Sequence, residues 1–161
     1  MSKIKRTKTI LSWALVVLWM CVIFASSSQP ALVSAELSTG LTAVLVRTVA
    51  KVLQLETPEV EPYLSMFNHL LRKAGHFTVY LILATLVVNA LRQSGVTGRR
   101  LYLMAFTCCL LYAITDEVHQ LFVPGRGGQV RDVLLDSCGA LVAILCAYVM
   151  SRRKTKDTET A

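Results

Sequence analysis

The sequence predicts an all-α, polytopic membrane protein with four transmembrane helices plus an outer amphipathic helix. Two observations support this fold class. Of the 161 residues, 54% are hydrophobic, and the mean hydropathy is +0.54, whereas soluble proteins are about 45–50% apolar. The charged residues are also gathered into short groups, and long apolar runs separate these groups. The length leaves room for one domain only, over residues 1–161.

Four apolar runs have the composition of membrane-spanning helices, which need about 20 mostly apolar residues. They cover residues 10–26, 74–91, 101–119 and 133–150. All five cysteines fall inside these runs without the spacing of metal ligands. We therefore expect them to pack as small hydrophobic residues at helix interfaces, with no chemistry of their own.

The charged residues between the spans predict the orientation in the membrane. One side receives 11 basic and 2 acidic residues, in the first tail, the second connection and the last tail, and the other side receives 6 basic and 8 acidic residues. Because an excess of Lys and Arg marks the cytoplasmic side, we expect both termini to be cytoplasmic. The same distribution argues against a nucleic-acid partner despite the net charge of +7, because the basic residues flank apolar runs and form no stripe.

Residues 34–71 form the expected outer segment. Apolar residues recur at helical spacing over 37–53, which is typical of an amphipathic helix that lies on the outer surface or covers the bundle. Thr57-Pro58 and Glu61-Pro62 predict a break after it, because the residue before a proline avoids the helical conformation. A further helix is expected from Tyr63, with Pro62 at its first turn, leading towards the second span.

Polar residues from all four spans are expected in one layer at the outer face. Ser26 to Gln29 end the first span, Arg72 to Tyr80 begin the second, Asp116 to Gln120 end the third, and Asp132 and Asp136 lie at the start of the fourth. Residues three or four positions apart share one helix face. The polar side chains of each helix can therefore point at those of its neighbours.

Burial of these charges predicts that they contact one another. A charged side chain at the centre of a bilayer costs about 2.5–3.5 kcal/mol on insertion scales, so such groups normally face each other. We expect an interior network that contains the following residues: His76, Asp116, Glu117, His119, Arg72 and Arg126. This network is either a structural clamp between helices or an outward-facing pocket, and both roles can hold together.

The connection over residues 124–129 contains three glycines around Arg126. Glycine-rich backbone can present N–H groups to an anion, and arginine can bind phosphate or carboxylate with two parallel hydrogen bonds. The segment is not a P-loop, because no Gly-Lys-Ser or Gly-Lys-Thr follows. A plain flexible turn explains the glycines equally well.

Three groups of residues together resemble the VanZ-like family of bacterial membrane proteins. The first is Trp19 to Pro30, W-M-C-V-I-F-A-S-S-S-Q-P, and the second is Arg72 to Tyr80, R-K-A-G-H-F-T-V-Y. The third is Tyr112 to Arg126, Y-A-I-T-D-E-V-H-Q-L-F-V-P-G-R, followed by Asp132-Val133 and Asp136 to Ala140. Their order and spacing agree over nearly the whole chain apart from the tails and much of residues 31–65. Asp136 departs from the pattern, because the family often has Asn there.

The resemblance implies a place in the cytoplasmic membrane of a bacterium. The founding member of the family gives low-level resistance to teicoplanin, a glycopeptide that carries an acyl chain. Carried over by position, the resemblance implies the following ligand-binding residues: Gln29, Arg72, Lys73, His76, Tyr80, Gln120, Arg126 and Asp132. It also implies these candidate catalytic residues: His76, Asp116, Glu117 and His119.

Three kinds of function follow as hypotheses. In the favoured one, the outer pocket binds an anionic membrane lipid or a lipid-linked cell-wall precursor. In the alternative, the protein is a membrane-embedded hydrolase or transferase acting on a lipid, in which His119 or His76 is the general base and Asp116 or Glu117 orients it. A variant with a divalent metal between these residues is disfavoured, because no HExxH or comparable motif is present, and we predict neither metal nor cofactor. An autonomous transporter is disfavoured by the lack of an inverted repeat, and the oligomeric state stays open.

Overall fold

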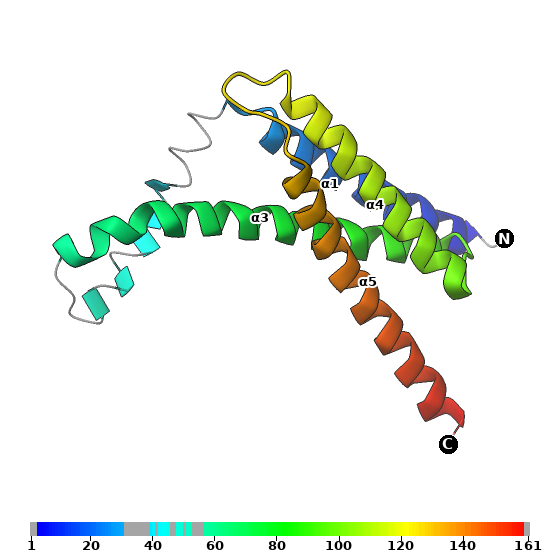
Figure 1. The fold of residues 1–161 in the computed structure, drawn as a ribbon. Helices are drawn as coiled ribbons and strands as arrows, with labels where there is room; N and C mark the ends of the chain where they lie inside the picture. The colour runs from blue at the N-terminus through cyan, green and yellow to red at the C-terminus, as the bar shows by residue number, and fades with distance from the viewer. Residues whose placement is uncertain are drawn as a thin grey trace.

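The computed structural model describes residues 3–30, 39–40, 42–45, 48–49, 51–52 and 57–159, with the side chains of 57–65 and 154–159 left out. Four long helices contain most of these residues. They are α1 (Lys3–Ser27), α3 (Thr57–Gln93), α4 (Gly98–Gln120) and α5 (Val130–Glu159). Figure 1 shows α3 as the longest, running across the molecule, with α1 and α4 on one side of it and α5 crossing it.

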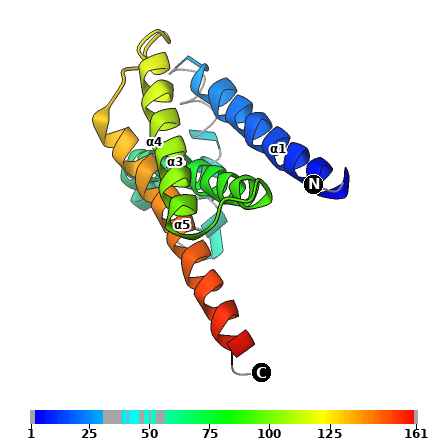
Figure 2. The ribbon, with the colours of Figure 1, turned by 90° about the vertical axis from the view of Figure 1, so that its right-hand side faces the viewer.

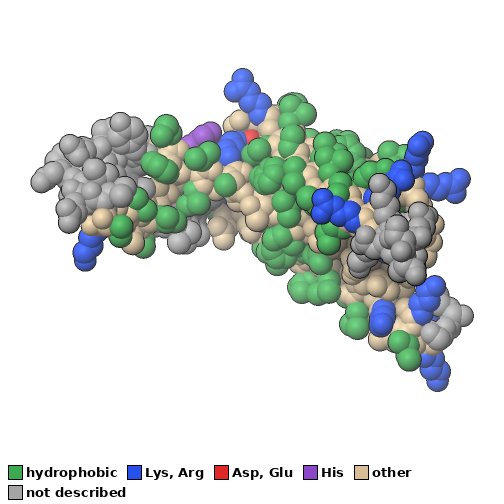
Figure 3. Space-filling model, turned by 90° about the horizontal axis from the view of Figure 1, so that it is seen from below, with side chains coloured by type: hydrophobic (Ala, Val, Ile, Leu, Met, Phe, Trp, Pro, Cys, Tyr) green, Lys and Arg blue, Asp and Glu red, His purple; other side chains and the backbone are tan. Residues whose placement is uncertain are grey.

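Each of the four predicted spans is confirmed as a helix long and apolar enough to cross a membrane. The spanning stretches are Lys3–Ser27, Met66–Gln93, Gly98–Gln120 and Val130–Arg153. Within the apolar 18-residue part of each stretch, between 17% and 39% is buried inside the protein. Most of their apolar surface therefore faces outwards, as lipid-facing helices require. Figure 3 shows one such face, on which apolar side chains cover much of the middle, with Lys and Arg side chains among them and at the right-hand end. The chain is a multi-pass membrane protein.

The helix that contains the second span begins earlier than the sequence predicts. The backbone is helical from Thr57 through Gln93, so the predicted break at Glu61-Pro62 is wrong. Pro58 lies in the first turn, where backbone N–H groups have no partner within the helix. Pro62 then removes only one hydrogen bond, to the carbonyl of Pro58, and the helix continues past it.

Much of the expected outer segment, residues 34–71, lies outside the described residues. Its described parts before α3 are helical. Val44, Val49 and Val52 are exposed there, whereas Thr42 is buried. These apolar side chains do not cover the bundle, so of the two expectations for this segment the described residues favour a helix whose apolar side faces the surroundings.

A close approach of two backbones determines how α3 and α5 cross. A Cβ atom at Gly139 would lie 2.3 Å from the carbonyl oxygen of Phe77, a distance that real Cβ atoms do not show. Only glycine at this position lets the helices come so near. The view in Figure 2, almost along α3, shows that α1 lies on one side of it and α5 on the other.

Small side chains also line the inner face of α4. Ala105, Cys109 and Ala113 recur every four residues and are fully buried, which allows close helix packing. The expected packing role of the cysteines is confirmed for Cys109. It is wrong for the three exposed cysteines, which are Cys21, Cys138 and Cys146, because their side chains are not buried between helices.

Hydrogen bonds to main-chain carbonyls join α1 to the rest of the bundle. Trp19 Nε1 donates to the carbonyl of Val79 at 2.9 Å, and Thr9 Oγ1 donates to that of Gln93 at 2.9 Å. In the reverse direction, the Tyr112 hydroxyl of α4 donates to the carbonyl of Met20 at 2.6 Å. These bonds place the end of α1 beside the end of α4.

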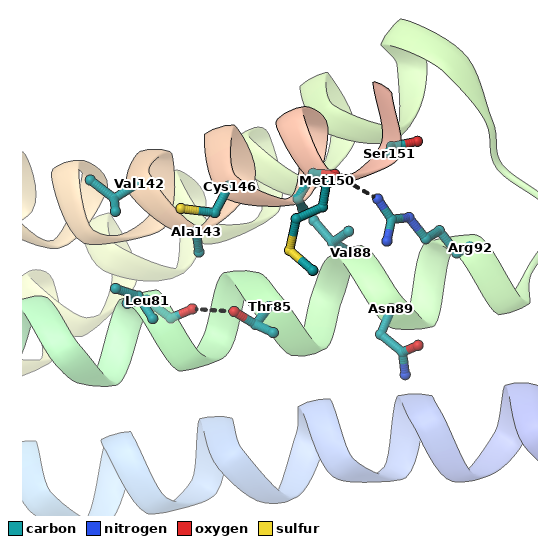
Figure 4. A pocket seen from close by; sticks show the side chains of 11 residues that line it. Leu81, Thr85, Val88, Asn89, Arg92, Val142, Ala143, Cys146, Met150 and Ser151 are labelled. Atoms are coloured by element: carbon teal, nitrogen blue, oxygen red, sulfur yellow. Dashed lines mark hydrogen bonds between the residues drawn. The ribbon is translucent and has the colours of Figure 1, made fainter. Parts of the chain in front are cut away.

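Beyond their crossing, α3 and α5 diverge and leave an open groove of about 910 Å³ between them (Figure 4). Its walls include Leu81 and Thr85 of α3 and Cys146 and Met150 of α5. Arg92 closes one end by donating to the carbonyl of Ala147 at 3.2 Å. None of the candidate site residues lines this groove.

Candidate functional site

The polar residues predicted to share one depth do gather at one end of the bundle. This polar end comprises the last turn of α1, residues 72–80 of α3, the last two turns of α4, the connection 121–129 and the first turns of α5. The helices place it by geometry, because α1 and α4 both end there and α5 begins there (Figure 1).

Two serines at the end of α1 contact the end of α4. Ser27 Oγ donates to Asp116 Oδ2 at 3.0 Å, and both side chains are buried. Ser28 Oγ lies 3.1 Å from His119 Nε2 and donates to the carbonyl of Phe24 at 2.7 Å. The His119 ring also stacks on Phe24, with centroids 4.3 Å apart.

Amide groups donate hydrogen bonds to some of the carboxylate oxygens of the two neighbouring acids on α4, Asp116 and Glu117. The side-chain nitrogen of Gln120 lies 3.3 Å from Asp116 Oδ2 and 3.3 Å from Glu117 Oε1. The backbone N–H of Gln129 donates to Glu117 Oε2 at 2.8 Å. That bond draws the connection over the end of α4, where a Cβ on Gly128 would lie 2.8 Å from the Glu117 carbonyl oxygen. Glycine is therefore needed at 128 for this contact.

Two ion pairs join α3 to the start of α5. Lys73 pairs with Asp132, and His76 Nδ1 lies 3.6 Å from Asp136 Oδ1. The crossing at Gly139 explains the second pair. His76 is next to Phe77, and Asp136 is one turn before Gly139, so the contact of the two backbones brings these side chains together.

Three buried carboxylates meet at the centre of the polar end. Asp116, Glu117 and Asp136 are 3%, 5% and 0% exposed, and one oxygen from each lies within 4.8 Å of the others. We call these three residues the carboxylate cluster. Both oxygens of Asp136 and Oδ1 of Asp116 have no hydrogen-bond partner among the described residues.

Tyr80 is a further buried polar group beside this cluster. Its side chain is fully buried, and its hydroxyl has no hydrogen-bond partner in the described part of the chain. Its ring lies 6.3 Å from that of Tyr112, one turn before Asp116.

The two predicted arginines do not neutralise these acids by direct contact. Arg72 is exposed and Arg126 is half-buried, and neither forms an ion pair with an acid whose side chain is described. They are close enough to interact, since burial and the positive charge of Arg72 lower the pKa of Arg126, whereas Asp116 and Glu117 act in the opposite direction. Among the described residues, the acids of the polar end contact serine and amide groups, His76 and Lys73, and not the two arginines of the expected network.

The remaining candidates occupy different surroundings. Gln29 is exposed. The alternative enzyme hypothesis expects Asp116 or Glu117 to orient His119, but His119 binds Ser28 and Asp116 binds Ser27. The arrangement of a base with an orienting acid occurs instead at His76 and Asp136. The enzyme hypothesis stays a prediction.

The sequence predicts that Asp136 lies in the outer layer, but Asp136 is not among the predicted site residues. Its position one helical turn after Asp132 was a usable signal, because both acids lie on one face of α5 and would point at the same neighbour. Ser27 was likewise part of the expected layer without an assigned role. A hydroxyl group carries no signal strong enough to single it out.

These features define a class: a multi-pass membrane protein in which helix ends enclose a cluster of buried acids, with two arginines close by. The chain belongs to the VanZ/LLP1 family, whose model matches residues 12–151. That range contains every candidate site residue, and it confirms the family resemblance. No curated protein and no solved structure matches the chain.

Proposed function

We propose that the polar end binds the phosphate-bearing head group of an anionic lipid or a lipid-linked cell-wall precursor at the outer leaflet of the bacterial cytoplasmic membrane. The observation that supports this most is the pair Arg72 and Arg126. Neither guanidinium group forms an ion pair with an acid whose side chain is described. Their N–H donors are therefore left to bind a phosphate group of a lipid.

The local backbone presents Arg126 in a way that suits this role. Gly125 has a φ of 75°, a conformation that glycine adopts without strain. The turn is closed by the N–H of Arg126, which donates to the carbonyl of Val123 at 3.1 Å. The arginine is therefore held on a tight turn next to the end of α4, beside the acids and not out in solvent.

Exposed apolar residues flank the same turn. Leu121, Phe122 and Val130 are 60%, 81% and 78% exposed. In a membrane protein, such side chains at a helix end are stable in contact with the interfacial lipid region. The turn would then lie at head-group depth, where a lipid phosphate can reach Arg126 from the side.

Lys73, Asp132 and His76 would have a positioning role in this proposal. Lys73 is engaged by Asp132, so it holds α3 against α5. Sequestration of a lipid-linked precursor is one way in which a family member can contribute to teicoplanin-type glycopeptide resistance, because it reduces the target available to the antibiotic.

Photocrosslinking tests the proposal in membranes. A benzophenone amino acid replaces Phe122, which is exposed beside the turn, and crosslinked adducts are identified by mass spectrometry. We expect adducts with phosphate-bearing lipids or precursors, at least several-fold fewer in Arg126→Ala and Arg72→Ala. Arg100→Ala, at the opposite end of α4, is the matched control and should leave adduct yield unchanged. Adducts dominated by uncharged lipids, or equal yields in all variants, would contradict the proposal.

A further inference from the structure

The carboxylate cluster has fewer paired basic groups than acids. His76, at 3.6 Å from Asp136, is the one basic group paired with any of the three acids in the described structure. Lys73 is engaged with Asp132, and Arg126 interacts with Asp116 and Glu117 without forming an ion pair with either. Carboxylates that share a buried site cannot all be ionised unless positive charge compensates them. Protons or a bound cation must therefore supply the part of the compensation that His76 and Arg126 do not provide.

The distances within the cluster match those around one metal ion. Oxygen ligands lie about 2.0–2.1 Å from Mg²⁺ and 2.3–2.6 Å from Ca²⁺, so two ligands of one ion are at most about 4 Å apart around Mg²⁺ and about 5 Å apart around Ca²⁺. One oxygen from each acid falls within the limit for Ca²⁺, because all three lie within 4.8 Å of one another. Around Mg²⁺ the three oxygens would have to come closer together.

Tyr80 supplies an independent indication that a ligand belongs there. It comes from α3, whereas the acids come from α4 and α5, and its buried hydroxyl lacks a partner among the described residues. A helical side chain leans towards the N-terminus of its own helix, so the Tyr80 ring points back to the level of His76 and Asp136. Tyr80 is therefore a buried polar group without a hydrogen-bond partner at the same level of the bundle as the oxygens of Asp136 and Asp116 that lack one.

We infer that Asp116, Glu117 and Asp136 bind one divalent cation of the hard, oxygen-preferring class, such as Mg²⁺, Mn²⁺ or Ca²⁺. Carboxylate oxygens are the ligands that these ions favour, and no described cysteine joins the cluster to favour a softer metal. The Tyr80 hydroxyl would bind the ion or one of its waters. The inference differs from the expectation that the protein uses no metal, and it is independent of whether a lipid binds at Arg126.

The identity of residue 136 is central to this inference. Asp136 contributes two oxygens without a hydrogen-bond partner in a fully buried position, and it reaches the acids of α4 because of the close approach at Gly139. An amide at this position would keep the size of the side chain but remove its charge and one oxygen. Asp136→Asn is therefore the variant that should weaken cation binding with least change of shape.

The test measures Mn²⁺ binding to the purified full-length protein in lipid nanodiscs after treatment with a chelator. Free Mn²⁺ is followed by electron paramagnetic resonance during titration. We expect one saturable site per chain, with affinity at least tenfold weaker in Asp136→Asn and in Asp116→Asn. Competition by excess Mg²⁺ or Ca²⁺ should release the bound Mn²⁺ and identify the physiological class of ion.

Two controls separate this inference from the proposed lipid site and from misfolding. Asp157→Asn makes the same chemical change near the end of α5 and should bind Mn²⁺ like the wild type. Arg126→Ala should retain Mn²⁺ binding while losing lipid adducts, so failure of one proposal is distinguishable from failure of the other. Absence of saturable Mn²⁺ binding to the folded wild type, or equal binding in both Asn variants, would overturn the inference and assign the compensating charge to protons.

Discussion

Replacement of Gly139 by alanine tests whether the crossing of α3 and α5 holds the polar end together. The new Cβ would lie 2.3 Å from the carbonyl oxygen of Phe77, and ordinary contacts begin at 3.4 Å. The obstructing atom belongs to a helix backbone, so no side-chain rotation can relieve the overlap. The two helices would have to separate by about 1 Å in a close-packed interior.

The size of the effect can be worked out by comparison with a second glycine. Overpacking of this kind costs about 1–3 kcal/mol, and alanine in a helix gains about 0.5–1 kcal/mol over glycine. Gly75→Ala on α3 gives the same gain without the overlap, because nothing described lies within 4 Å of its Cβ position. The difference between the two variants therefore isolates the overpacking term and should be about 1–3 kcal/mol in favour of Gly75→Ala.

Thermal unfolding of purified protein in detergent, followed by the loss of a monodisperse species, measures this difference. We expect the midpoint to fall for Gly139→Ala and to stay level or rise for Gly75→Ala. Separation of the helices should also weaken Mn²⁺ binding, because Asp136 and His76 lie beside the contact. Equal midpoints for the two variants would refute the close approach as a source of stability.

Two further predictions concern the hydrogen bonds of α1 and the orientation of the chain. Tyr112→Phe removes the 2.6 Å bond to the Met20 carbonyl and should destabilise the bundle by about 0.5–1.5 kcal/mol in the same unfolding assay; an unchanged midpoint would mean that the bond contributes nothing net. In a cysteine-free background, Gly127→Cys should react with a membrane-impermeant maleimide in intact cells, and Thr97→Cys should react only after lysis. The opposite labelling pattern would reverse the predicted topology.

The sequence was sufficient to locate the spans because the signal for a transmembrane helix is local. Apolar length and composition decide whether a helix is stable in lipid, and neither depends on distant residues. The predicted start of α3 was wrong, and the cause of this error is also local. The sequence marks both prolines as breaks, but Pro58 occupies a first turn that needs no N–H donors.

The sequence predicts which residues gather at the polar end, but it does not predict which of these residues contact one another. Orientation and helix ends place Asp116 and His76 in one layer. Which groups touch depends on how the helices cross, and that depends on the contact of Gly139 with Phe77. A glycine in an apolar run has no distinctive pattern, so its effect on Asp136 could not be derived from spacing.

The way α1 is attached has a consequence for how freely its neighbours can vary. Its bonds end on carbonyl oxygens of the main chain at positions 79 and 93, and its own carbonyl at position 20 receives the bond from α4. Every amino acid provides such an oxygen, so the accepting positions tolerate almost any side chain that fits in the bilayer. We therefore expect selection to conserve the three donors, Thr9, Trp19 and Tyr112, and to allow substitutions at the positions that accept their hydrogen bonds.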